Sequence, residues 1–498
     1  MTSSDPDLDA ALSTIRRFAE ERIRDTKLER AGVLSLQLRS ELAELGVFGL
    51  NLPAEYGGSA FGLRGATRAV AELARHDRSV ATTVGLHLGL GTRGLVGFGT
   101  DTQRERWLPD LASGKSIASF AATEPNAGSD LAAITTTLAS SNDQLTLRGE
   151  KAYVTNGGFA GIFTVLAKSP GLGGAQRGHS LVVVERTDSG VDVGAEEHKL
   201  GLRASSTTPI RFDVSLSPDR VLGAPGTGMT LAQEILAFGR TLMSAGCEGA
   251  ARAALHRALE HTQTRRQFGR VLLSLDVVKD QLAEMASEVF AIEAIVSWAA
   301  HADPDRLERP DQQLERRSLS AKVYASEACG RVCDRAIQLF GGSGFIEDIG
   351  VAILARDARV TRIFEGANDV LLQKAGAVWA MEGKSWKPAG GSAVELCEAL
   401  DAYRDDLVKS RGVRLLGDAR ALHRLGSLAI ARDLIEAMDL RATNFDATAR
   451  GERDRKNITS LTNYMLERLG AGVRETMSAR NSGDLAASIV DALVERDS

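Results

Sequence analysis

The segment Arg356-Asp-Ala-Arg-Val-Thr-Arg-Ile-Phe-Glu-Gly-Ala-Asn-Asp-Val-Leu-Leu372 decides how the rest of the sequence is interpreted. One carboxylate, Glu365, follows three apolar residues that would turn inward on a helix: Val360, Ile363 and Phe364. A carboxylate kept in an apolar setting has a raised pKa, which suits a base that removes a weakly acidic proton near neutral pH. The alternative is a helix that ends at Gly366 and leaves Glu365 exposed beside the turn. Taken alone, these residues favour the alternative.

Length, composition and charge exclude several classes of protein. At 498 residues, the chain exceeds what one hydrophobic core usually holds, so several domains are expected. A hydrophobic content of 43% and a net charge of -5 are ordinary for a soluble globular protein and give no reason to expect nucleic-acid binding. No run approaches the roughly 18 apolar residues of a membrane span. The N-terminus is polar and acidic, without the apolar core of a signal peptide, which predicts a cytoplasmic protein.

The cysteine pattern indicates free thiols in a reducing compartment. None of the four cysteines forms a CxxC pair, and none has a histidine or further cysteine at metal-binding spacing. Cys329 and Cys333 are four residues apart, so they could share one face of a helix. We expect buried free thiols, no disulfide framework and no metal site.

The spacing of apolar residues divides the chain into four regions. Residues 1–115 have helical spacing, interrupted by turn formers at Asn51-Leu-Pro-Ala-Glu-Tyr-Gly-Gly58. Residues 116–222 contain short runs rich in Val, Ile, Thr and Phe, which predict a small β-domain. Helical spacing returns over residues 223–383, with long amphipathic stretches at 285–300 and 319–339 that fit an antiparallel bundle. Helix breakers at 384–392 precede a last helical segment, residues 393–498.

Two pairs of residues could hold a flat, phosphate-bearing ligand. Alternation on a strand puts Tyr153 and Thr155 on one face, where a ring and a hydroxyl could lie against a heterocycle; ordinary cross-strand packing is the alternative. Arg265 and Phe268 are three residues apart, which places them on one face of a predicted helix. A guanidinium binds a pyrophosphate and a phenyl ring stacks on adenine, although a surface arginine above a core phenylalanine is equally compatible.

Four segments together resemble the signature segments of the acyl-CoA dehydrogenase family, from about residue 40 to about residue 383. They are Phe120-Ala-Ala-Thr-Glu-Pro-Asn-Ala-Gly-Ser-Asp130, Arg265-Arg-Gln-Phe-Gly269, Gln338-Leu-Phe-Gly-Gly-Ser-Gly-Phe345 and the segment that contains Glu365. The resemblance implies a mainly α fold: an N-terminal helical domain, a middle β-barrel-like domain and a C-terminal four-helix bundle. The additional helices at the C-terminus resemble those of the very-long-chain branch of the family.

The resemblance also implies roles for individual residues. Glu365 corresponds to the catalytic base. Residues that correspond to FAD-binding positions are Phe120, Ala122, Thr123, Ser129, Tyr153, Thr155, Arg265, Phe268, Gln338, Gly341, Gly342, Ala367 and Asp369. Residues expected beside the thioester substrate are Ser129, Arg240 and Gly366; an interior ion pair is the alternative for Arg240. The segment from Lys199 to Thr208 resembles β-domain framework near the flavin.

Three positions depart from the family pattern. Tyr153 replaces the usual Trp but keeps an aromatic ring for stacking. Ala367 replaces the usual Thr after Glu-Gly and removes one hydroxyl near the cofactor, so we expect weaker flavin retention. Asp276 stands where several members have Gln, which puts one hydrogen bond to the cofactor in doubt.

The implied reaction is α,β-dehydrogenation of an acyl thioester to the trans-2-enoyl thioester, as in fatty acid β-oxidation. The resemblance assigns flavin N5 as the hydride acceptor, with hydrogen bonds from the Glu365 backbone N–H and a flavin ribityl hydroxyl to the thioester oxygen. One alternative is a carrier-protein thioester dehydrogenase, or an oxidase or monooxygenase of the same fold. Another is a non-catalytic scaffold.

The resemblance implies two protein partners. An electron-transfer flavoprotein would accept the electrons. A second copy of the chain would complete the flavin site, because the family equivalents of Arg265, Phe268 and the loop from Gln338 to Gly342 bind flavin held by a neighbouring subunit. A homodimer is favoured over a tetramer, because in the long-chain branch the C-terminal extension occupies the region where a second dimer would pack.

Overall fold

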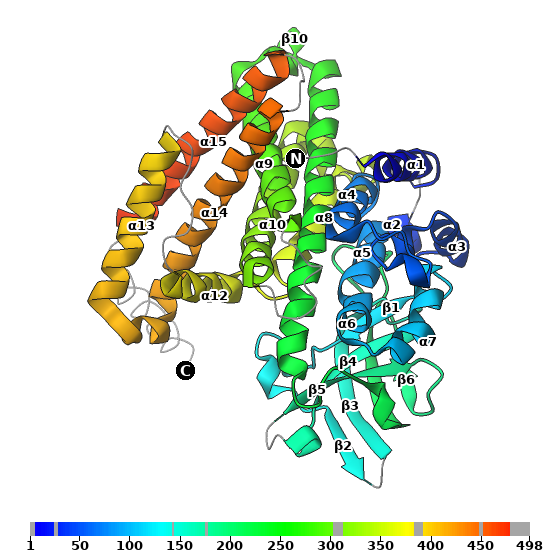
Figure 1. Ribbon diagram of the computed structural model, residues 1–498. Helices are drawn as coiled ribbons and strands as arrows, with labels where there is room; N and C mark the ends of the chain where they lie inside the picture. Colours follow the sequence, from blue (N-terminus) through cyan, green and yellow to red (C-terminus); the bar gives the residue numbers. More distant parts are fainter. Residues whose placement is uncertain are drawn as a thin grey trace, which may run out of the picture. The chain divides into compact units, whose positions relative to one another are not determined.

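The computed structural model describes residues 5–23, 28–141, 144–174, 178–301, 312–382, 392–447 and 452–478 (Figure 1). The chain forms two compact units, Met1–Ala367 and Asn368–Ser498. The first unit contains a helical part, a β-sheet part and a second helical part, in chain order. The predicted fold class, mainly α with a small middle β-domain, is therefore confirmed.

The N-terminal part of the first unit is built from helices, several of which begin at a side-chain cap. Asp5, Ser35 and Asp77 each accept hydrogen bonds from backbone N–H groups of the helix that follows. In the predicted turn at 51–58, a Cβ on Gly58 would lie 2.1 Å from the carbonyl oxygen of Leu52, so only glycine fits there. The helices are α1 (Pro6–Arg22), α2 (Leu28–Ala31), α3 (Leu36–Glu44), α4 (Gly62–Ala74), α5 (Arg78–Leu86), α6 (Thr92–Phe98) and α7 (Asp101–Ala112).

The middle part is a mostly antiparallel sheet with strand order β6-β7-β3-β2-β4-β5-β8, in which β1 pairs with β4 in parallel. A register shift interrupts the pairing of β3 with β7 between Lys151 and Val154. The strands are β1 (Ala118–Ala121), β2 (Thr137–Ser141), β3 (Gln144–Thr155), β4 (Ile162–Lys168), β5 (His179–Glu185), β6 (Val191–Val193), β7 (Thr207–Leu216) and β8 (Val221–Leu222).

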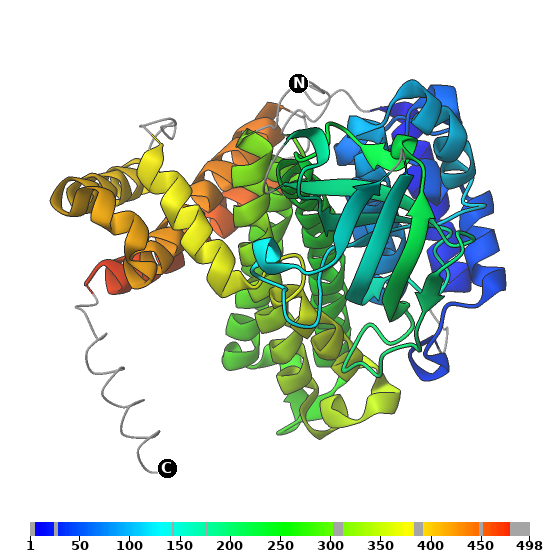
Figure 2. The same ribbon diagram turned by 90° about the horizontal axis from the view of Figure 1, so that it is seen from below.

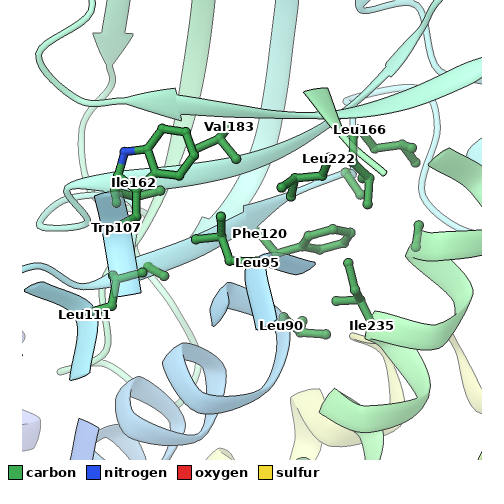
Figure 3. Packing of buried hydrophobic residues seen from close by; sticks show 14 of the residues in the cluster. Leu90, Leu95, Trp107, Leu111, Phe120, Ile162, Leu166, Val183, Leu222 and Ile235 are labelled. Carbon is green, nitrogen blue, oxygen red and sulfur yellow. The ribbon is translucent and has the colours of Figure 1, made fainter. Parts of the chain in front are cut away.

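Both faces of the central strands β4 and β5 are buried. Successive side chains of a strand point to opposite faces, so each of these strands contributes to two cores. On β4, Phe163 and Val165 belong to a core formed within the sheet domain. Ile162 and Leu166 point the other way, into a second core with Trp107 of α7 and residues of α6, β1 and β8 (Figure 3). This second core attaches the sheet to the helices of the first unit.

The C-terminal part of the first unit is a set of long helices around α8 (Figures 1 and 2). Helix α8 packs against α4, α9 and α10. The two predicted amphipathic stretches, 285–300 and 319–339, lie within α9 and α10 and are confirmed as helical. The helices are α8 (Gly228–Thr264), α9 (Asp276–Ala300), α10 (Gln312–Phe340) and α11 (Val351–Arg359).

The second unit contains the predicted C-terminal helices and has a core of its own. Gly376 of α12 and Gly426 of α14 let these two helices touch backbone to backbone, since a Cβ on either would lie about 2 Å from a carbonyl oxygen of the other helix. Of the predicted break at 384–392, residues 384–391 lie outside the described residues. The helices are α12 (Asn368–Met381), α13 (Ser392–Arg411), α14 (Ala419–Ala447) and α15 (Glu452–Ser478).

All four cysteines are free and buried, as the sequence predicts. Cys329 and Cys333 both lie on α10, with their sulfur atoms 3.9 Å apart. Within the described ranges, no helix is both long and apolar enough to cross a membrane.

Candidate active site

Glu365 lies in a short loop after α11. The helix ends at Arg359, a single 3-10 turn spans Val360–Arg362, and Glu365 then adopts a φ of 55° before Gly366 at 104°. The predicted inward turn is wrong for Ile363, which is 55% exposed, because the helix has already ended there. The alternative of a helix continuing to Gly366 is wrong for the same reason.

The Glu365 carboxyl group is enclosed although the residue as a whole is only half-buried. Its Oε2 atom is inaccessible to solvent and has no hydrogen-bond partner among the described residues. It lies beside Gly239 of α8, where a Cβ would be 3.3 Å from Oε2 and 2.3 Å from Cδ2 of Leu90. Burial raises the pKa of Glu365 to about 7, against the opposing influence of the Arg240 and Lys322 cations.

Two buried cations hold the backbone on either side of this carboxylate. Arg240 of α8 donates from Nε to the carbonyl oxygen of Glu365 at 2.9 Å, and Lys322 of α10 donates from Nζ to that of Gly366 at 2.7 Å. The Nη1 atom of Arg240 is buried and has no partner within the described part of the chain. The structure thus brings together the predicted residues Glu365, Gly366 and Arg240.

Sequence reasoning did not single out Lys322. The available signal was its setting: the residues around it on α10, from Ser318 to Ala325, are all small, apolar or aromatic except Lys322 itself. A lysine surrounded in this way on every face of a helix is expected to be buried.

A buried ion pair fixes the end of β1 against β3. Lys151 donates from Nζ to the Ala122 carbonyl and to Oε1 of Glu124, both at 2.9 Å. Glu124 also accepts hydrogen bonds from Thr135 and Thr136. Burial alone would raise the pKa of Glu124, but these hydrogen bonds outweigh burial and lower the pKa to about 2.

The predicted ligand-facing residues of the sheet lie at this junction. The backbone N–H of Ala152 donates to the carbonyl of Thr123. The bulge that follows puts Tyr153 at a φ of 55° and leaves the residue 65% exposed. Thr155 is half-buried and Ser129 is exposed, while Phe120 and Ala122 are buried. An exposed ring and a nearby hydroxyl at a strand end can receive a flat heterocycle.

The segment from Lys199 to Thr208 joins the sheet to the loop of Glu365. The Asn156 N–H at the end of β3 donates to the Ser206 carbonyl at 3.0 Å. The Leu202 N–H donates to Oδ1 of Asp357 on α11 at 2.6 Å. The strand end and the helix that leads to Glu365 are therefore held by one stretch of chain.

The predicted helix face shared by Arg265 and Phe268 is wrong. Helix α8 ends at Thr264, and a two-stranded hairpin follows, β9 (Arg266–Gln267) and β10 (Arg270–Val271). Phe268 occupies the hairpin turn with a φ of 53° and is 87% exposed, and Arg265 is exposed as well. Neither residue belongs to the core of the described chain.

The predicted glycine-rich segment, Gln338 to Phe345, lies next to the end of α8. His261 near the end of α8 stacks on Phe340 at the end of α10, with ring centroids 4.2 Å apart. The expected loop from Gln338 to Gly342 is partly helical: Gln338 is exposed on the last turn of α10, and the glycines open a 3-10 helix, Gly341–Phe345.

Two further predicted positions, Ala367 and Asp369, lie two and four residues after Glu365 in the chain. Ala367 is half-buried and ends the first unit. Asp369 is exposed on α12 of the second unit, with its Oδ1 atom 3.5 Å from Nε2 of His423.

Comparison with known proteins gives a consistent result. Three family models match the chain: the acyl-CoA dehydrogenase N-terminal domain over residues 5–115, the middle domain over 119–214 and the C-terminal domain over 226–378. The human mitochondrial very long-chain specific acyl-CoA dehydrogenase is 34% identical over 475 residues, which cover 92% of this chain and 71% of that protein.

The fold of the chain is also similar to those of solved acyl-CoA dehydrogenase structures. The butyryl-CoA dehydrogenase of Megasphaera elsdenii is 33% identical with a TM-score of 0.72, covering 76% of this chain and 99% of that one. An acyl-CoA dehydrogenase of Bacillus anthracis, solved in complex with FAD, has a TM-score of 0.86 over 96% of this chain and 88% of that one. At 23% identity, the latter shows similarity of fold alone.

Proposed function

The chain belongs to the acyl-CoA dehydrogenase family, and from this we propose that it is an FAD-dependent dehydrogenase of acyl-CoA thioesters with Glu365 as the catalytic base. The observation that carries the assignment of the base is the enclosed, unpartnered Oε2 atom of Glu365. A carboxylate with a pKa of about 7 is matched to proton removal near neutral pH.

The residues present fit FAD. Tyr153 offers an exposed ring beside the half-buried Thr155, which suits the isoalloxazine system. Phe120, Ala122, Thr123 and Ser129 lie on or after β1 and suit the flavin edge. Arg265, Phe268, Gln338, Gly341 and Gly342 are exposed and suit the adenine dinucleotide end, and Ala367 and Asp369 are the remaining candidates.

In the proposed reaction, the Glu365 carboxylate takes the α-proton of the thioester. The backbone N–H of Glu365 donates to the thioester carbonyl oxygen and stabilises the negative charge that develops there. Arg240 holds the Glu365 backbone, and its Nη1, which has no partner among the described residues, is available to the substrate. Ser129 and Gly366 are the other residues that we propose lie beside the substrate. Bound FAD supplies the acceptor for the β-hydrogen, which leaves with its electron pair, so that a trans-2-enoyl thioester remains.

The test is anaerobic mixing of the purified yellow protein with acyl-CoAs of increasing chain length, following flavin absorbance. We expect bleaching with the wild-type protein and at least about a 10³-fold slower rate with Glu365→Gln. Glu260→Gln, which removes an exposed carboxylate of α8, is the matched control and should bleach at the wild-type rate.

The other outcomes identify the alternatives. Absence of bleaching with flavin bound would contradict the acyl-CoA assignment and point to carrier-protein thioesters. Oxygen consumption during turnover would indicate an oxidase. A colourless purified protein would point to a scaffold.

The proposal extends to partners and location. The exposed aromatic side chains of Phe268 and Phe345 support a homo-oligomer, with a dimer favoured, in which a second copy covers them. Electrons would pass to an electron-transfer flavoprotein. The four buried free thiols support a reducing compartment, and the cytoplasm is our prediction; cell fractionation tests it.

A further inference from the structure

We propose that Lys322 is a positioning residue for the catalytic base: its ammonium group holds the Gly366 carbonyl and so keeps Glu365 in the left-handed conformation that encloses its carboxylate. The inference rests on the proposed function, because it concerns how the proposed base is prepared. The hydrogen bond from Lys322 Nζ to the Gly366 oxygen is 2.7 Å long, and the lysine has no exposed surface.

The backbone of this loop needs such a restraint. Glu365 has a φ of 55°, which residues with a side chain rarely adopt, and such strain persists only where the surroundings enforce it. The 3-10 turn before it ends at Arg362, so Glu365 and Gly366 lie outside any helix. Instead, Arg240 of α8 donates a hydrogen bond to the carbonyl group of Glu365, and Lys322 of α10 donates one to the carbonyl group of Gly366.

Lys322 also acts on the carboxyl group through its charge. Arg240 and Cys247 of α8 and Lys322 of α10 are the groups that influence Glu365. Glu315 acts on Arg240, and Glu327 acts on Lys322. Burial lowers the pKa of Lys322, and the neighbouring Glu365 carboxylate opposes this by favouring the charged lysine.

The direction of the effect follows from these signs. A positive charge favours the ionised carboxylate, so removing the Lys322 charge raises the pKa of Glu365 above about 7. The variant then needs a higher pH to generate the base. If Lys322 only contributed to the packing of α10 and did not act on Glu365, its removal would lower stability without moving this titration.

The experiment follows the protonation of Glu365 directly. Infrared titration of the FAD-bound protein without substrate records the carboxylic acid C=O band that is lost in Glu365→Gln. Lys322→Met removes both charge and hydrogen bond, Lys322→Gln removes the charge but keeps a donor, and Lys322→Arg keeps both. The matched control is Lys151→Met, which removes another fully buried lysine that pairs with Glu124 instead.

We expect the midpoint to rise by about one pH unit in Lys322→Met and Lys322→Gln, and to stay near the wild-type value in Lys322→Arg and Lys151→Met. The alkaline shift should reappear in the pH profile of flavin reduction by acyl-CoA. Lys322→Gln replaces Lys322→Met as the decisive variant if the latter does not fold.

An unchanged midpoint in a folded charge-removing variant would overturn the proposal, as would an equal shift in Lys151→Met. Because the infrared titration needs no substrate, its result is independent of the acyl-CoA assignment. A midpoint shift without any flavin reduction by acyl-CoA would support the role of Lys322 and contradict the proposed function.

Discussion

Glu365 destabilises the folded protein whenever it is ionised, because its carboxyl group is enclosed and Oε2 lacks a partner among the described residues. Its pKa is raised from 4.5 to about 7, so the folded state binds the proton more tightly than the unfolded state does. The stabilising effect of the proton is complete below about pH 4.5 and is lost as the pH rises through about 7. The raised pKa that suits Glu365 to the proposed role of base therefore lowers stability at neutral and alkaline pH.

We predict that Glu365→Gln is more stable than the wild-type protein above about pH 7, by on the order of 2–3 kcal/mol in the free energy of unfolding. The difference should vanish near pH 4.5, where the wild-type carboxyl group is also neutral. Thermal unfolding of both proteins across this pH range measures it. A constant difference at every pH would show that the carboxyl group is not desolvated as the structure has it.

A second residue-scale feature is Gly239 of α8, which lies beside the Glu365 carboxyl group. A Cβ at Gly239 would lie 2.3 Å from Cδ2 of Leu90 and 3.3 Å from Oε2 of Glu365. We predict that Gly239→Ala costs about 1–3 kcal/mol in stability and slows flavin reduction, because Leu90 must move and the carboxylate is crowded.

Gly246 provides the matched control on the same helix. A Cβ there would meet its nearest neighbour, an Arg78 nitrogen, at 3.6 Å, which is ordinary contact. Gly246→Ala should be neutral or stabilising by up to about 1 kcal/mol and leave flavin reduction unchanged. Equal effects of the two substitutions would contradict the crowding at Gly239.

The sequence singled out Glu365 and Arg240 through their segments, but not the contacts that hold them in the structure. Periodicity identifies a face of a helix, whereas Glu365 lies after the helix has ended. The sequence did not predict a role for Gly239 or Lys322, because the role of each depends on which atoms of other elements lie beside it. Such contacts between α8, α10 and the loop follow from tertiary packing, which a linear pattern does not contain.

At the scale of elements, the clearest error concerns the end of α8. The three-residue spacing of Arg265 and Phe268 fits a helix, but the chain turns into a hairpin at Thr264. The available signal was Gly269, which has a φ of 75° and is typical of a tight turn. In contrast, β4 and β5 were predictable because continuous runs of apolar residues serve two cores at once.

The ion pair between β3 and the end of β1 leads to a prediction about how these elements are held. Lys151 and Glu124 are almost inaccessible, at 0% and 3% side-chain exposure, so removing one partner leaves a buried charge. We predict that Lys151→Met lowers the free energy of unfolding by about 3 kcal/mol. Lys115→Met, which breaks an exposed pair with Asp110, should change it by less than about 1 kcal/mol.

The pH dependence of the same pair has the opposite sign to that of Glu365. The pKa of Glu124 is lowered to about 2, so its stabilising contribution is present above about pH 4.5 and is lost as the pH falls towards 2. Urea unfolding between pH 3 and pH 6 should show a steeper loss of stability for the wild-type protein than for Glu124→Gln. Parallel curves would contradict this role of the ionised carboxylate.

At the scale of the whole molecule, the order of helical, β and helical parts was predictable because each part has its own hydrophobic period. The division into two compact units was less accessible, since the second unit begins at Asn368, within a stretch of helical spacing. Helix α12 belongs to it through its close contact with α14 at Gly376 and Gly426. Glycines that permit helix contact resemble helix-weakening glycines until the partner helix is known.

Phe268 is 87% exposed at the tip of the hairpin, in a backbone conformation that few residues with a side chain adopt. A large aromatic ring held in that position is expected to be covered by another molecule. If a second copy of the chain and its FAD cover it, Phe268→Asp should weaken oligomerisation and flavin retention together, because one desolvated contact serves both.

Sedimentation velocity and the ratio of flavin to protein absorbance measure the two quantities on the same sample. Leu36→Asp is the matched control, since Leu36 is 70% exposed on α3, far from the hairpin in sequence, and should change neither. We expect the wild-type protein to sediment as a dimer and the Phe268 variant to shift towards monomer with at least about a tenfold weaker hold on FAD, equivalent to about 1.4 kcal/mol. Loss of flavin from a variant that remains dimeric would place the ring at a site within one subunit, and an unchanged variant would contradict the interface.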